Sequence, residues 1–190
     1  MEKKPAFTTY KIVFIAVMAA VVCVVTFFRF PLMGSKVHFA NSMCLLSGLL
    51  FGPVGGGLAA GIGSALYDAL FGGYGAVECA ITFVSKFLMA FICALIAGKA
   101  KDGSGAAAKA RMTAACVIGA LSYVALYMLK TFVYQRFVYG YPGDAVWVTM
   151  LGKLPASLIN AVFAMVVTPV IYAALLPALK KTGTLKRLSA

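Results

Sequence analysis

The chain has 190 residues, of which 63% are hydrophobic, and its mean hydropathy is +0.97. Soluble domains are about 45–50% apolar, so this composition indicates an integral membrane protein without a soluble domain of its own. The net charge of +12 would suggest a nucleic-acid-binding protein if the chain were soluble. Here the basic residues fall in short segments between apolar runs, as membrane topology requires, and this pattern argues against nucleic acid as a partner.

The apolar runs predict an all-α membrane protein, a bundle of six transmembrane helices. The first run follows Lys3, Lys4 and Lys11, and its length favours a spanning helix over a cleaved signal peptide. Residues 37–67, as one helix, would be roughly 46 Å long, which exceeds a hydrocarbon core of about 30 Å. Because Gly52-Pro53 marks a turn near the middle, we expect two helices there.

Further breaks follow along the chain at residues 72–75, in a polar loop at residues 99–111 and in a second loop at residues 139–144. Pro155 and Pro169 interrupt the last apolar run, so its first turns either lie flat at the membrane surface or belong to a kinked helix. We therefore predict a single domain, residues 1–190, with spans at about residues 12–29, 40–51, 54–71, 79–98, 112–134 and 147–178.

Charge predicts the orientation. With six helices, the basic amino terminus, the 99–111 loop and the basic carboxyl terminus all lie on one side of the membrane. The positive-inside rule makes that side cytoplasmic, so both termini are expected in the cytoplasm. The outer loops are then at about residues 30–39, 72–78 and 135–146.

Ionisable residues within or beside the spans are costly and all fall in the outer half. They are Asp68, Glu78, Lys86, Lys130, Arg136, Asp144 and Lys153. Asp68 and Lys86 could form a purely structural ion pair, and Lys130 and Lys153 could extend outward to the membrane surface. Tyr139, Tyr141 and Trp147 are typical interfacial residues. The alternative is a polar cavity open to the outside that captures a small ligand with several hydrogen-bonding groups.

Small residues four apart form two faces that favour close helix packing. In the third helix these are Gly57 and Gly61, for which packing within the chain is the favoured interpretation. In the first helix they are Ala16 and Ala20, which suit an intermolecular partner equally well.

Motifs of several enzyme classes are absent from the sequence. There is no Walker A motif, no His-Glu-x-x-His zinc site and no Gly-x-Ser-x-Gly nucleophile elbow. The five cysteines form no Cys-x-x-Cys pair, and His38 is the single histidine. We expect no catalytic residues, no metal site, no cofactor and no enzymatic activity in this chain.

The second, third and fourth predicted helices carry a more specific pattern. His38-Phe-Ala-Asn-Ser-Met-Cys-Leu-Leu-Ser-Gly-Leu-Leu-Phe-Gly-Pro53 is followed by Gly57-Leu-Ala-Ala-Gly-Ile-Gly-Ser-Ala-Leu-Tyr-Asp68, by Gly73-Tyr74 and by Thr82-Phe-Val-Ser-Lys86. This sequence resembles the substrate-binding (S) component of energy-coupling factor (ECF) transporters, which are vitamin importers of bacteria. The resemblance is clearest over the first four helices.

The resemblance implies a multi-pass protein of the bacterial plasma membrane that binds a vitamin or vitamin precursor near its outer face. It implies as partners a transmembrane coupling (T) protein and two cytoplasmic ATPases, with Ala16 and Ala20 in the docking surface for the coupling protein. Asn41, Asp68, Tyr74 and Lys86 resemble ligand-side positions of the family.

Further candidates for substrate binding come from depth and charge rather than from the resemblance. They are Glu78, Lys130, Tyr134, Lys153 and Asn160, which would suit an anionic or a polar heterocyclic ligand. Two other interpretations remain open: a stand-alone secondary carrier or channel for a small polar solute, and a membrane enzyme or assembly protein.

Overall fold

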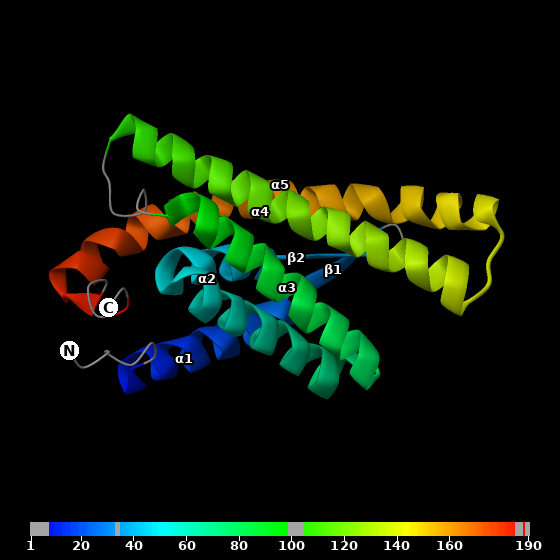
Figure 1. The fold of residues 1–190 in the computed structure, drawn as a ribbon, viewed down its shortest axis with the longest axis horizontal. Coiled ribbons are helices and arrows are strands. Elements are labelled where there is room, and N and C mark those ends of the chain that lie inside the picture. Colours follow the sequence, from blue (N-terminus) through cyan, green and yellow to red (C-terminus); the bar gives the residue numbers. More distant parts are fainter. Residues whose placement is uncertain (1–7, 33–34, 99–104, 185–187, 189–190) are drawn as a thin grey trace, which may run out of the picture.

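The computed structural model describes residues 8–32, 35–98, 105–184 and 188. Five helices are long and apolar enough to cross a membrane, and they form the elongated bundle of Figure 1. The elements are α1 (Thr9–Thr26), β1 (Arg29–Leu32), β2 (Ser35–His38), α2 (Ala40–Tyr67), the π-helical turn η1 (Asp68–Gly72), α3 (Ala76–Ala97), α4 (Ala106–Val133), the π-helical turn η3 (Tyr134–Val138) and α5 (Gly143–Lys181).

Helix α2 reverses direction at Gly52, as the Gly52-Pro53 pair suggested. Gly52 has a φ of 78°, a left-handed conformation that favours glycine. The Ser47 hydroxyl donates a hydrogen bond to the Gly56 carbonyl at 2.9 Å, and the Cys44 sulfur lies 3.8 Å from the Ser64 hydroxyl. Residues twenty apart in a straight helix would be about 30 Å apart. The two halves of α2 therefore form an antiparallel helical hairpin.

Glycines let this hairpin pack closely against its neighbours. A Cβ on Gly57 or Gly61 would lie 2.7 or 2.8 Å from the ring of Phe87 or Phe83 on α3. Gly63 lies directly against the backbone of Ala19 on α1. Gly57 and Gly61 thus serve packing within the chain, the favoured interpretation from sequence.

The segment expected as an outer loop at residues 30–39 is instead an antiparallel hairpin of β1 and β2. Its register pairs Arg29 with His38 and Pro31 with Lys36. At four residues each, these strands are too short to give a clear alternating pattern. The hairpin packs against α5 and places three polar side chains beside the centre of the bundle.

Two helices also differ from expectation, α4 in where it begins and α5 in its continuity. α4 begins at Ala106, although a polar loop was predicted as far as Arg111, because an alanine-rich run continues the helix beyond the apolar span. α5 is continuous over 39 residues, with Pro155, Pro169 and Pro177 inside it. Some of the basic residues from which the orientation was predicted lie outside the described residues: Lys3, Lys4, Lys99, Lys101, Lys186 and Arg187.

The start of α1 and the end of α5 lie at the same end of the bundle, together with the end of α3 and the start of α4 (Figure 1). The turn between α4 and α5 lies at the opposite end. Lys11, Lys109, Arg111, Lys180 and Lys181 belong to the first end, whereas all three described acids, Asp68, Glu78 and Asp144, are near the other end.

Candidate ligand-binding site

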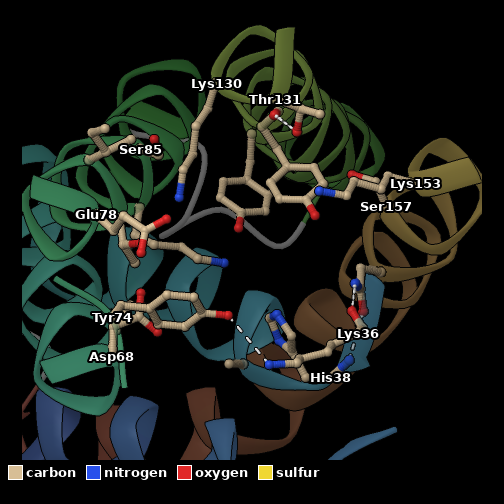
Figure 2. Close-up of a pocket in the computed structure, with 18 of the residues that line it drawn as sticks. Lys36, His38, Asp68, Tyr74, Glu78, Ser85, Lys130, Thr131, Lys153 and Ser157 are labelled. Atoms are coloured by element: carbon tan, nitrogen blue, oxygen red, sulfur yellow. Dashed lines mark hydrogen bonds between the residues drawn. The ribbon is translucent and has the colours of Figure 1, made fainter. Parts of the chain in front are cut away.

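A polar cavity of about 310 Å³ lies among the β1–β2 hairpin, η1, η3 and the adjoining parts of α2, α3, α4 and α5 (Figure 2). This volume is at the lower end of the range for small-molecule sites, roughly 300–1,000 Å³. Every one of these elements contributes a side chain, so the cavity forms only when the whole bundle is assembled. Its polar and charged lining includes Arg29, Lys36, His38, Asp68, Glu78, Ser85, Lys86, Lys130, Thr131, Gln135, Lys153, Ser157 and Asn160.

The structure brings together eight of the nine side chains proposed from sequence as substrate-binding. These are Asp68, Tyr74, Glu78, Lys86, Lys130, Tyr134, Lys153 and Asn160. The ninth, Asn41, is buried directly behind the lining and contacts Lys86. Whether these residues bind a substrate stays a prediction, but the cavity into which they were expected to converge is present.

Lys86 is the most deeply placed cation of the cavity, and only 3% of its surface is exposed. Its ammonium group donates a hydrogen bond to the amide oxygen of Asn41 and lies 3.7 Å from the centre of the Tyr123 ring. The structural ion pair considered for Asp68 and Lys86 is therefore replaced by an amide and an aromatic ring. Both partners are uncharged, so neither supplies a counter-charge to the Lys86 ammonium group.

Asn160 fixes the β hairpin to α5. Its side-chain oxygen accepts a hydrogen bond from the His38 backbone N–H, and its side-chain nitrogen donates one to the Lys36 carbonyl, both at 2.8 Å. Asn160 is buried, and its amide is occupied by these two bonds. Its contribution to the site is therefore chiefly to position Lys36 and His38.

His38 presents a neutral imidazole to the cavity. Burial, together with the charges of Lys86, Arg29 and Lys36, lowers the pKa of His38 from 6.5 to about 3. Its Nδ1 atom is buried and has no hydrogen-bond partner. Because an unpaired buried polar atom is costly, Nδ1 is a candidate contact for a ligand.

Six tyrosines line the same cavity: Tyr67, Tyr74, Tyr123, Tyr127, Tyr134 and Tyr139. Tyr123 and Tyr127 are stacked with ring centroids 6.3 Å apart, and Tyr134 meets Tyr139 edge-on at 6.2 Å. The Tyr74 hydroxyl accepts a hydrogen bond from Lys36 at 3.4 Å. Rings of this kind supply flat apolar surfaces with polar edges, which suit a planar heterocycle that carries hydrogen-bonding groups.

Sequence reasoning missed the contribution of the hairpin. Arg29, Lys36 and His38 were assigned to an outer loop or its edge, with no expected role in binding. The one available signal was the presence of two cations and the single histidine within the twelve residues that precede the proposed site residue Asn41. In the described part of the chain, no group of three His, Cys, Asp or Glu side chains could hold a metal ion.

A family model described as "ECF-type riboflavin transporter, S component" matches residues 6–176. The chain belongs to this family. This S component is therefore a membrane protein of the ECF transport systems, as the resemblance in its first four helices implied. No curated protein matches its sequence.

A solved structure supports the fold of this S component. The structure is titled "Structure and mechanism of the S component of a bacterial ECF transporter", and it matches with a TM-score of 0.64. The match covers 90% of this chain and 97% of that one at 19% sequence identity, which shows a common fold.

The depressed pKa of His38 predicts a loss of stability in acid. Protonation of His38 costs more free energy in the folded protein than in the unfolded one. The contribution of the neutral imidazole to the free energy of unfolding is therefore complete above about pH 6.5 and declines as the pH falls toward 3. Between pH 7.5 and pH 5 we expect a loss of as much as about 2 kcal/mol.

Thermal unfolding of the ligand-free protein in detergent at several pH values measures this loss. The matched variant is His38→Gln, which cannot titrate and should lose less stability over the same interval. Identical pH profiles for the two proteins would contradict the assignment of a neutral His38 imidazole with a lowered pKa.

Proposed function

We propose that this S component captures a vitamin or vitamin precursor from outside a bacterial cell and delivers it with a coupling protein and two cytoplasmic ATPases. The observation that carries the proposal is the cavity, whose lysines, tyrosines and uncharged histidine converge from every part of the bundle near one end. Because the family is described as riboflavin transporters, riboflavin is the first ligand to test.

The distribution of charge supports a six-span topology with both termini in the cytoplasm. The reversal of α2 at Gly52 and the position of the start of α1 at the same end as the end of α5 both fit an even number of spans. That end carries only basic residues among the described charged ones, which the positive-inside rule assigns to the cytoplasm. The cavity then opens to the outside of the plasma membrane.

The core on the cytoplasmic side supports capture rather than conduction by this chain alone. Beyond the cavity, the second half of α3 buries Ala90, Cys93 and Ala97 in the core. The first half of α4 buries Ala115 and Cys116 in the same core. These side chains are apolar and closely packed, and they offer a polar ligand no partners. This closed core supports passage of the ligand by a movement of the protein, which we assign to the action of partner subunits.

The exposed face of α1 supports docking to a coupling protein. Ala16 and Ala20 are exposed, in contrast to Ala19 and Val22, which pack into the bundle. Small exposed residues four apart allow another helix to approach closely within a membrane. Exposed Val13 and Val17 extend this face along the helix.

Ligand-dependent stabilisation tests the capture function. The purified protein alone should unfold at a higher temperature in the presence of one member of a panel that contains riboflavin, other vitamins and their precursors. At 100 times its dissociation constant a ligand adds about 2.7 kcal/mol of stability. If no vitamin or precursor shifts the unfolding temperature, the proposed capture function is wrong.

Bulky substitutions on α1 test the docking surface. Ala16→Trp and Ala20→Trp should retain the ligand-induced shift, because neither residue lines the cavity, and should lose at least tenfold in uptake by cells that contain the coupling module. The control is Ala114→Trp, an exposed alanine on α4 toward the same end of the bundle.

Two outcomes would contradict this assignment. Loss of ligand binding in the α1 variants would place these alanines in a structural role. Uptake into vesicles that contain only this chain would show a stand-alone carrier that needs no docking surface.

A further inference from the structure

The cavity contains more cations than a neutral ligand requires. Five cationic side chains line it, Arg29, Lys36, Lys86, Lys130 and Lys153, against two acids, Asp68 and Glu78. His38 adds no positive charge, because its imidazole is neutral. The lining therefore carries a surplus of positive charge that a ligand is in a position to neutralise.

The charged side chains are unevenly distributed around the cavity. The acids come from η1 and from the start of α3, whereas the wall formed by β2 and α5 presents Lys36 and Lys153 without an acid. Figure 2 shows Lys130, Lys153 and Lys36 directed toward the cavity from three sides, with Asp68 and Glu78 together on another. Lys153 thus faces the cavity from the wall across from the two carboxylates, and the surplus is largest on that wall.

The cations have few partners within the protein. In the described part of the chain, no carboxylate oxygen lies within 4.0 Å of their nitrogens. Arg29 and Lys130 lie over tyrosine rings at 5.0 and 5.5 Å, Lys36 contacts Tyr74, and Lys153 has no hydrogen-bond or ion-pair partner there. An unpaired cation in a partly enclosed cavity is a ready partner for an anion.

The proposed membrane topology makes the surplus of cations in the cavity unusual. Lysine and arginine are normally biased toward cytoplasmic segments, so a group of them at the outer end runs against the positive-inside bias. The field of this group also acts on its own histidine, because Lys86, Arg29 and Lys36 all lower the pKa of His38. The cavity therefore has a positive potential that membrane topology does not explain.

We propose that the ligand carries a compact anionic group, a phosphate or a carboxylate, held between Lys36 and Lys153 with Lys130 above it, while its ring lies among the tyrosines. This inference rests on the proposed capture function and narrows the substrate to an anionic heterocycle. Ser157, buried one turn after Lys153 on α5, supplies a hydroxyl donor on the same wall.

Matched pairs of neutral and phosphorylated ligands test the inference. The dissociation constants of riboflavin and riboflavin 5′-phosphate, and of pyridoxine and pyridoxine 5′-phosphate, are measured for the full purified chain at low and at high salt. The phosphate form of at least one pair should bind at least tenfold more tightly at low salt. This advantage should shrink at high salt because ions screen the charges.

Two variants locate the anionic group. Lys153→Gln should reduce the advantage of the phosphate form to less than about threefold, whereas Lys180→Gln, at the far end of the same helix and outside the cavity, should preserve it. Thermal unfolding of both variants without ligand verifies that they fold.

The outcomes separate the inference from the function on which it rests. A neutral form that binds as tightly as its phosphate, or an advantage that survives Lys153→Gln, would overturn the anionic group and leave the capture function intact. If both pairs fail to bind while a neutral vitamin of the wider panel stabilises the protein, the anionic group alone is wrong; if no member of the panel binds, the capture function is wrong.

Discussion

The arrangement of the site depends on the burial of Lys86 without an acid beside it. A charge removed from water is costly unless polar groups surround it, and here the amide of Asn41 and the ring of Tyr123 supply that environment. These three residues come from α2, α3 and α4, so the lysine contact joins three helices at the base of the cavity. A carboxylate partner would have neutralised the charge, whereas the neutral partners leave it available to a ligand.

The β hairpin completes the cavity from the side opposite α3 and α4. Asn160 binds its backbone at two points, and this attachment to α5 places Lys36 and His38 against the cavity. The two functions proposed for the chain are separated in space as a result. The cavity lies near one end of the bundle, and the exposed Ala16 and Ala20 of α1 are outside its lining, so the proposed ligand site and the proposed docking face use different residues.

The sequence predicted the bundle and much of the site because both depend on strong local signals. Gly52-Pro53 indicated the reversal of α2, and the cost of charge in a membrane made Lys130 and Lys153 informative by depth alone. The hairpin was not predictable, because strands of four residues carry little pattern and their pairing with α5 is a long-range contact. For the same reason the sequence placed Asn160 in the site but could not show that its amide is used to hold β2.

Affinity measurements on a single variant test the central claim most directly. Lys86→Met replaces the buried ammonium with an apolar group of similar length, and the folded variant should bind the ligand that stabilises the wild-type protein at least tenfold more weakly. Lys180→Met, which alters an exposed lysine at the far end of α5, should bind it with unchanged affinity. Equal dissociation constants for Lys86→Met and the wild-type protein would contradict a ligand site built around this lysine.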